Sequence, residues 1–244
     1  MKVSLFITCL VDQLCPNVGL ATVKVLEKAG CEVAFDSRQT CCGQPAFNTG
    51  YRDEARQFAK RFIGIFEESD AAAIVSPSGS CVAMVKHFPD LFSDDENWRK
   101  RADAIAGKTH ELSSFLVNVL QTVELGAALD SKLTFHDACH GLRDLGIRSE
   151  PRQLLENVEQ VEFIELKNAD ACCGFGGTFS VKYPEISTAI LEQKVSAIEE
   201  SGADFVVSCD ASCLMQISGM LERRGSKVKT KHLAEILAED RTTR

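Results

Sequence analysis

The cysteines of this 244-residue chain follow one spacing pattern twice. Each copy contains two adjacent cysteines followed by glycine, with another cysteine 32 or 33 residues earlier and a fourth 39 or 40 residues later. The first copy consists of Cys9, Cys41, Cys42 and Cys81, and the second consists of Cys139, Cys172, Cys173 and Cys213. Metal ligation explains a repeat of cysteines over such distances better than packing does. The repeat also requires the two halves of the chain to fold alike.

The segments between the cysteines match as well. In each half a strand-like run ends near the first cysteine, a helical stretch and a short strand follow, and a long amphipathic helix comes after the cysteine pair. A second apolar strand then leads to the last cysteine. The expected strands and helices are 3–8, 18–29, 31–35, 51–68 and 72–76 in the first half, and 133–137, 151–157, 161–166, 184–200 and 204–208 in the second.

The best strands, 73–75 and 205–207, are continuous apolar runs, which is typical of buried parallel strands. We therefore predict an α/β protein with two pseudo-symmetric repeats, each a small, mostly parallel sheet flanked by helices. The cysteine loops should lie at the carboxyl ends of the strands, where such sheets bind ligands. The predicted cysteine-rich domains are residues 1–125 and 126–244.

Two further expectations concern less regular segments. Residues 108–112 and 229–233 are similar to each other, and each should introduce a terminal helix. The polar run at 93–103, which the second half lacks, should be a solvated excursion, and its single tryptophan could mark a contact surface.

Composition limits the classes of partner. The chain is 45% hydrophobic and 25% charged, so it can build an ordinary core. Its net charge of -8 argues against nucleic acid or an anionic membrane as the main partner. No apolar run approaches the length of a membrane span, which requires about 18 residues or more. We expect a cytoplasmic protein, in which cysteine clusters usually serve metal or redox chemistry.

Thiolate sulfur is a soft ligand that selects zinc or iron–sulfur clusters. Adjacent cysteines are poorly placed to form a disulfide with each other, but both can face one site if the backbone turns sharply. Gly43 and Gly174 permit such a turn, and the N–H groups there could donate hydrogen bonds to sulfur. Structural zinc is the main alternative, although its usual close C-x2-4-C pairs are scarce here. Thiol–disulfide chemistry without a metal is the third.

The remaining candidates have weaker support. Cys15 and Cys31 have no counterpart in the second half, and we expect both to be small buried hydrophobic residues. Cys209 is a candidate auxiliary ligand because it lies close to Cys213. His136 and His140 flank Cys139, and each is either a donor behind the ligands or an ordinary histidine.

These motifs resemble those of a known family. TCCGQPAFN at residues 40–48 and CCGFGGTF at 172–179, each within the longer cysteine pattern, are similar to the cysteine-rich domain family. That family includes the cysteine-rich subunit of heterodisulfide reductase and the iron–sulfur subunit of glycolate oxidase. The resemblance covers essentially the whole chain.

The resemblance implies an iron–sulfur electron-transfer subunit of a bacterial L-lactate oxidation system. Such a subunit relays electrons to an acceptor and is not autonomous, because it works with a ferredoxin-like iron–sulfur subunit and a third, cysteine-poor subunit. The expected cofactor is one [4Fe–4S] cluster per half, held by the eight repeated cysteines and sensitive to loss in air. A disulfide reductase subunit of the heterodisulfide reductase type and a zinc-stabilised interaction module remain the alternatives.

The chain departs from the heterodisulfide reductase relatives at two positions. Those relatives ligate unusual clusters with an additional cysteine, in a C-x-x-C pair, that is replaced here by Ser78 in one half and Asp210 in the other. Four shared thiols remain in each half. Asp210 is therefore a candidate auxiliary oxygen ligand of the second site.

Overall fold

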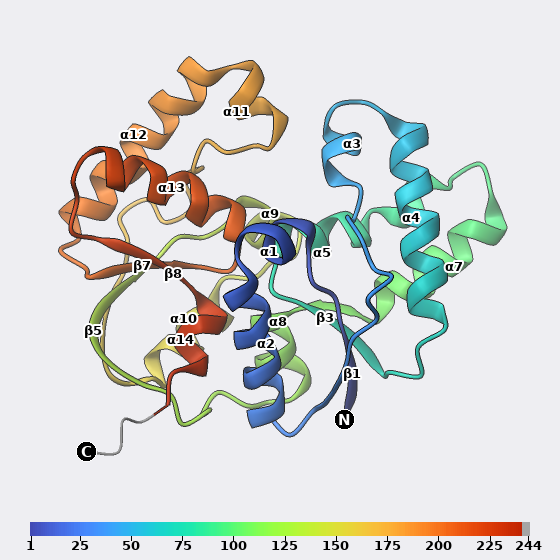
Figure 1. Cartoon of the computed structure of the whole chain (residues 1–244), viewed down its shortest axis with the longest axis horizontal. Helices are drawn as coiled ribbons and strands as arrows, with labels where there is room; N and C mark the ends of the chain where they lie inside the picture. The colour runs from blue at the N-terminus through green and yellow to red at the C-terminus, as the bar shows by residue number, and fades with distance from the viewer. Residues whose placement is uncertain (241–244) are drawn as a thin grey trace.

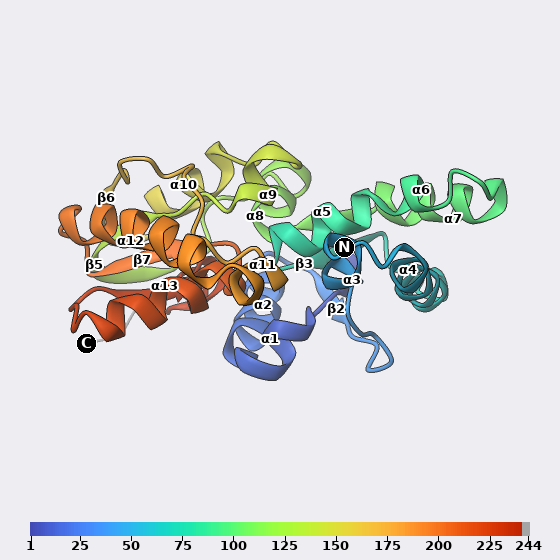
Figure 2. The same cartoon turned by 90° about the horizontal axis from the view of Figure 1, so that it is seen from above.

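The computed structural model describes residues 1–240, which form two four-stranded parallel sheets side by side (Figure 1). Their strand orders are β2-β1-β3-β4 and β6-β5-β7-β8, so both sheets have the same topology. Helices flank each sheet, as Figure 2 shows from above. The predicted α/β architecture of two repeats is thus confirmed.

The first half contains, in chain order, β1 (Lys2–Leu5), α1 (Cys9–Leu14), α2 (Pro16–Lys28), β2 (Glu32–Ala34), α3 (Gln44–Asn48), α4 (Arg52–Glu67), β3 (Ala73–Ser76), α5 (Gly79–Lys86), α6 (Phe88–Leu91), α7 (Glu96–Gly107), β4 (Thr109–Glu111), α8 (Leu112–Ser114) and the π-helical turn η1 (Phe115–Val119). The second half contains β5 (Ala128–Phe135), α9 (Cys139–Arg143), α10 (Ser149–Glu156), β6 (Glu159–Ile164), α11 (Thr178–Lys182), α12 (Pro184–Glu200), β7 (Phe205–Ser208), α13 (Ala211–Arg223), β8 (Lys229–His232) and α14 (Leu233–Ala238).

Apolar residues at helical spacing determine which face of each long helix is buried. In α2, Pro16 supplies a favourable first residue, and Val18, Thr22, Val25 and Leu26 are buried on one face. The corresponding long helices α4 and α12 each begin close to the cysteine pair and run back along their sheet. These helices fix the position of the cysteine loops relative to the strands.

Two expectations were incomplete. Thr109–Glu111 and Lys229–His232 form the fourth strand of each sheet, paired in parallel with β3 and β7, which the sequence did not predict. Helices do follow them, as α8 and α14. These edge strands are short and carry polar residues, so their apolar pattern is weak.

The polar insertion is also more ordered than predicted, because most of it is helix α7. Trp98 is half-buried in this segment. Its ring stacks against Phe92 at 5.8 Å between centroids, and the Arg101 guanidinium lies 3.9 Å from the indole centroid. The suggestion that the tryptophan marks a contact surface stays a prediction.

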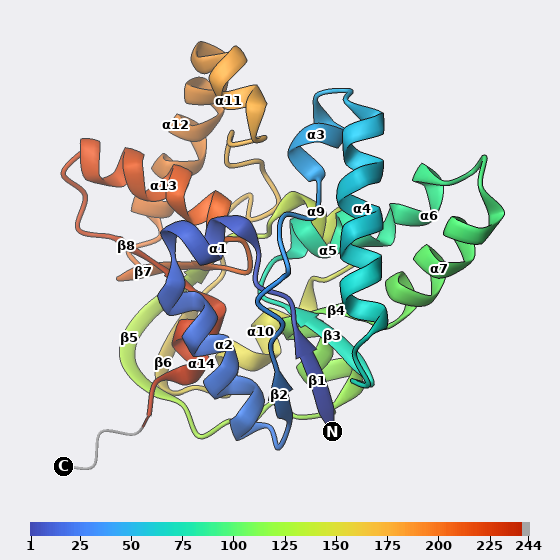
Figure 3. The ribbon, with the colours of Figure 1, turned by 45° about the vertical axis from the view of Figure 1, so that its right-hand side comes forward.

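The two halves share a hydrophobic core. One cluster of buried residues combines Val3 and Val75 from the first sheet with Leu133 and Val207 from the second. Helices α2 and α14 lie against each other in the middle of the molecule (Figure 3). Three further helix pairs cross the seam, α5 with α9, α8 with α10 and α1 with α13. The division into domains 1–125 and 126–244 stays a prediction, although one sheet falls on each side of it.

Within residues 1–240, no helix is both long and apolar enough to cross a membrane.

Candidate metal site

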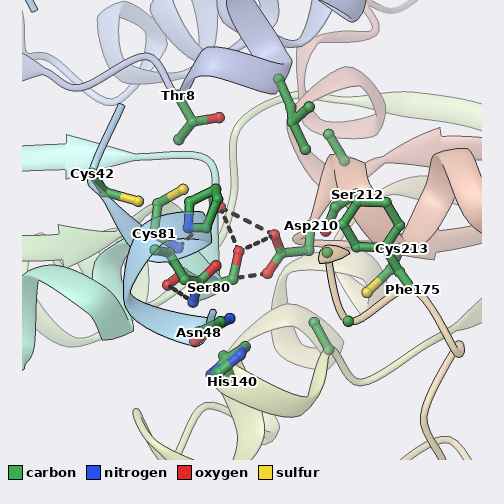
Figure 4. A pocket seen from close by; sticks show the side chains of 18 of the residues that line it. Thr8, Cys42, Asn48, Ser80, Cys81, His140, Phe175, Asp210, Ser212 and Cys213 are labelled. Atoms are coloured by element: carbon green, nitrogen blue, oxygen red, sulfur yellow. Dashed lines mark hydrogen bonds between the residues drawn. The ribbon is translucent and has the colours of Figure 1, made fainter. Parts of the chain in front are cut away.

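All eight repeated cysteines line a single cavity of about 220 Å³ between the two halves. They reach it from both sheets, and Figure 4 shows Cys42 and Cys81 on one side with Cys213 opposite. The cavity also contains Ser78, Ser80 and Asp210, and its walls are mostly apolar. The structure therefore brings together every cysteine that the sequence pattern singled out.

Helix N-termini present four of these cysteines. Cys9 and Cys139 are the first residues of α1 and α9, and Cys81 and Cys213 are the third residues of α5 and α13. The partial positive charge and free N–H groups at a helix N-terminus stabilise thiolate. At Cys9 and Cys139, however, hydrogen bonding to Cys41 and Cys172, together with burial, raises the pKa of the thiol.

A tight glycine turn orients each cysteine pair. Gly43 and Gly174 have φ values of +86° and +84°, and their N–H groups donate to Cys41 Sγ at 3.4 Å and Cys172 Sγ at 3.3 Å. The space is restricted as well, since a Cβ on Gly174 would lie 2.5 Å from the carbonyl oxygen of Ser187. This confirms the predicted turn, which only glycine accommodates without strain.

The four thiols of the first half form one contact network. Cys9 Sγ lies 3.7 Å from Cys41 Sγ. Hydrogen bonds from Cys42 and Cys9, with help from the Gly43 N–H, lower the pKa of the Cys41 thiol well below its usual range. Hydrogen bonding to Cys41 and Cys81, together with burial, raises the pKa of Cys42. The thiol contacts therefore favour a thiolate at Cys41.

The second half repeats this arrangement. Hydrogen bonds from Cys139 and Cys173 lower the pKa of Cys172. Hydrogen bonding to Cys172 and Cys213, with burial, raises the pKa of Cys173. In both halves the contacts among the thiols thus favour a thiolate at the first cysteine of the adjacent pair.

Asp210 links the two halves at the cavity. Its buried carboxylate accepts hydrogen bonds from Ser78 Oγ at 3.0 Å, from Ser80 Oγ at 2.8 Å and from the Ser80 backbone N–H at 2.9 Å (Figure 4). Burial raises the pKa of this carboxyl group. Ligation of a metal by Asp210 stays a prediction, and it would require some of these bonds to break. Sequence reasoning missed Ser80, whose role depends on a contact between residues 130 positions apart.

The histidines beside Cys139 have different environments. His140 is part of the cavity wall, and its Nδ1 lies 2.5 Å from the Asp144 carboxylate. His136 is 1% exposed, and one of its ring nitrogens lies with the sulfurs of Cys173 and Cys213 in a group whose atoms are all within 4.8 Å of one another. Burial lowers the pKa of His136 to about 3, so the ring is neutral.

The unrepeated cysteines do not line the cavity. Cys31 is buried in the shared core, as predicted, and Cys15 is half-buried between α1 and α2. Cys209 is buried next to Glu111. Burial and the charge of Glu111 both raise the pKa of the Cys209 thiol. Nothing in this placement supports Cys209 as an auxiliary ligand.

Comparisons with known proteins agree with this geometry. The family model described as "Cysteine-rich domain" matches residues 3–86 and 133–218. The chain is 51% identical over 238 residues to "Lactate utilization protein A" of Exiguobacterium sp., covering 98% of this chain and 97% of that protein. It is 50% identical over 237 residues to the protein of the same name in Bacillus subtilis, covering 97% and 99%.

Among solved structures, a hypothetical protein from Helicobacter pylori superposes with a TM-score of 0.64 at 12% identity. The match covers 97% of this chain and 48% of that one, so this chain spans about half of that protein, and the likeness concerns the fold alone. With both cysteine repeats matched by the family model and half of all residues shared with full-length relatives, the chain belongs to the cysteine-rich domain family and, within it, to the lactate utilization protein A family.

Proposed function

We propose that the chain is an iron–sulfur electron-transfer subunit of a bacterial lactate utilisation system. The observation that carries this proposal is the convergence of two four-cysteine groups on one cavity. The name of the relatives supplies the process, lactate utilisation. A bound iron–sulfur cluster would supply one-electron transfer, for which the isolated side chains have no capacity.

The donor set fits such a cofactor. Each half offers four soft sulfur donors, which is the number that an ordinary [4Fe–4S] cluster requires. The N–H groups of Gly43 and Gly174 already donate to sulfur, and such bonds are among the factors that set cluster potentials. We therefore propose Cys9, Cys41, Cys42 and Cys81 as the ligands of one cluster and Cys139, Cys172, Cys173 and Cys213 as those of the other.

One distance favours a second candidate, a zinc-stabilised module. Two thiolates on one tetrahedral zinc ion at about 2.3 Å are roughly 3.8 Å apart, close to the 3.7 Å between Cys9 and Cys41. The cavity argues for clusters instead. Four thiolates that close around a single ion leave little space, whereas about 220 Å³ extends between the two cysteine groups.

A disulfide reductase is the other alternative, and the shared cavity is the observation in its favour. A substrate disulfide could lie between the two groups. The positions that carry an additional cysteine in the heterodisulfide reductase relatives argue against it, because Ser78 and Asp210 occupy them and hydrogen-bond to each other.

We expect the electron-transfer subunit to depend on a ferredoxin-like iron–sulfur subunit and a third subunit, in the cytoplasm. The experiment is lactate-dependent dye reduction by the anaerobically reconstituted chain, alone and with the two partners. The chain alone should be inactive and the mixture active. Steady turnover by the chain alone would contradict the proposal, and disulfide reduction by the chain alone would favour the alternative.

A further inference from the structure

The pseudo-symmetry of the fold shows where the two metal sites differ. Phe6 and His136 occupy equivalent positions, because each lies three residues before the first cysteine of its half. Each also donates its backbone N–H to the neighbouring strand at 2.8 Å, Phe6 to the Val75 carbonyl and His136 to the Val207 carbonyl. A phenyl ring in the first half is thus an imidazole in the second.

A second exchange accompanies the first. The buried positions of α4 recur in α12 with one constant offset, which pairs Ala55 with Ser187 and Phe62 with Lys194. The contacts of the two glycine turns support this alignment, since Gly43 lies against Ala55 and Gly174 against Ser187.

In the first half the two aromatic rings touch. Phe6 and Phe62 pack edge to face with centroids 4.8 Å apart, in the same apolar cluster as Cys42. The side chains behind this cysteine group are therefore apolar.

In the second half the same two positions are polar. Lys194 is 1% exposed, and its ammonium donates to the carbonyl oxygens of Asn168 at 2.6 Å and Ala169 at 3.1 Å. The charge of Lys194 acts on His136 and contributes to the lowered pKa of the imidazole. Burial lowers the pKa of Lys194, and the neighbouring thiols of Cys173 and Cys213 oppose this by raising it. A buried cation thus stands behind the second cysteine group.

The imidazole of His136 makes no hydrogen bond of good geometry, although the Ala169 carbonyl lies near enough to raise its pKa. Neither Nδ1 nor Nε2 has a hydrogen-bond partner among residues 1–240, although the residue is buried. Buried polar groups are normally paired, so each such group in a folded protein requires an explanation. The sulfurs of Cys173 and Cys213 lie within 4.8 Å of a ring nitrogen and are candidate partners. The other candidate, the Ala169 carbonyl, already accepts a hydrogen bond from Lys194.

We propose that His136 and Lys194 distinguish the second metal site from the first: the His136 N–H donates a hydrogen bond to a thiolate of the bound cluster, and the Lys194 ammonium adds a positive charge. This inference rests on the proposed function. Both groups stabilise the more negative, reduced state of the second site, so its reduction potential is higher than that of the first. Electron transfer from the first site to the second is then thermodynamically favoured.

The experiment is an EPR-monitored redox titration of the full chain after anaerobic reconstitution with ferrous iron and sulfide. Cys42→Ser and Cys173→Ser assign the two signals. Wild type should show two midpoint potentials, the higher one from the second half. His136→Phe installs the residue found in the first half. It should lower only the second midpoint potential, by at least about 59 mV, which corresponds to a tenfold change in the equilibrium constant for one electron.

Three further variants separate a functional effect from a structural one. His136→Asn keeps an N–H donor and should retain most of the second midpoint, whereas Lys194→Met should lower it. Phe6→Leu exchanges one apolar residue for another in the first half and should leave both midpoints in place. In the metal-free chain, His136→Phe should melt no earlier than wild type because it removes two unpaired buried nitrogens; if that variant does not fold, Lys194→Met carries the test.

Unchanged second midpoints in His136→Phe and Lys194→Met, with both sites loaded, would overturn the inference while leaving the proposed function intact. A first site at the higher potential in wild type would also overturn it. A wild-type chain that binds no iron would refute the proposed function itself, and the two failures are therefore distinguishable.

Discussion

At the scale of single residues, the turn after each cysteine pair depends on one glycine. Gly43 and Gly174 combine a left-handed backbone with close contacts, so a side chain there meets two separate obstacles. The sequence alone predicts the first obstacle, because glycine directly after two cysteines indicates a sharp turn. It does not predict the second, which arises from the long helix that packs over the turn.

We expect Gly174→Ala to lower the free energy of unfolding of the metal-free chain by about 2–5 kcal/mol, the combined cost of the strained φ and the clash with Ser187. The matched control is Gly202→Ala, at a φ of +69° with no atom within 4 Å of the added Cβ. That control should cost about 1 kcal/mol. Chemical denaturation measures both, and equal losses would show that the contact with Ser187 has no energetic weight.

The sequence and the structure assign different roles to Asp210. The C-x-x-C comparison makes it a candidate ligand of the second site. The structure engages its carboxylate with Ser78 and Ser80 of the first half, directly before Cys81. This partnership depends on tertiary contact alone, and no local pattern indicates it.

We therefore predict that Asp210→Ala lowers the free energy of unfolding by about 1–3 kcal/mol, because it leaves buried donors unpaired. It should also weaken iron retention in the first half, where the N-terminus of α5 loses its support. Exposed Asp103→Ala, on α7 and outside the cavity lining, is the control, and iron analysis with EPR is the measurement. Loss of iron from the second half alone would support ligation by Asp210 instead.

At the scale of the elements, the strands that were predicted well are the apolar central ones, β3 and β7. The edge strands β4 and β8 escaped prediction because they are short and polar and gain their place only through pairing with a neighbour. The long helices α4 and α12 were predicted closely, since their amphipathic pattern extends over four turns or more. Local sequence therefore predicts a helix or strand reliably where that element buries its own apolar residues.

The junction between β8 and α14 provides a pH-dependent connection between the halves. His232 begins α14 by accepting the Ala234 N–H at Nδ1, and its Nε2 lies 3.0 Å from the Pro77 carbonyl of the first half. Burial lowers its pKa to about 4. The unfolded chain then binds a proton more readily than the folded one between pH 6.5 and 4, so stability falls as the pH decreases through this range.

For His232 alone this linkage amounts to about 2 kcal/mol between pH 7 and pH 5. We expect His232→Asn, which can still cap the helix, to lose that much less stability than wild type over this interval. Urea denaturation at the two pH values measures the difference. Exposed His87→Asn should behave like wild type, and an identical pH dependence in all three proteins would contradict the assigned pKa.

At the scale of the whole molecule, the sequence predicted two like halves and the convergence of cysteines within each half. The fusion of both groups into one cavity could not be predicted, because it depends on how α1, α5, α9 and α13 cross the seam. The sequence singled out His136 beside Cys139, but it did not reveal Lys194, whose equivalence to Phe62 emerges only when α4 and α12 are compared.

We predict that each half holds its own cofactor. Cys42→Ser should remove the iron of the first half and Cys173→Ser that of the second, because each cysteine is a buried member of only one thiol network. Cys31→Ser, at a buried cysteine away from the cavity, is the matched control and should retain all iron. Complete loss of iron from either single variant would instead indicate one cofactor shared across the seam.

The most direct measurement of the central claim is the content of iron, acid-labile sulfide and zinc in the full chain, purified and reconstituted without oxygen. The account predicts iron and sulfide in equal amounts, about four of each per cysteine group, with zinc absent. Stoichiometric zinc without sulfide, retained by the same cysteines, would contradict it.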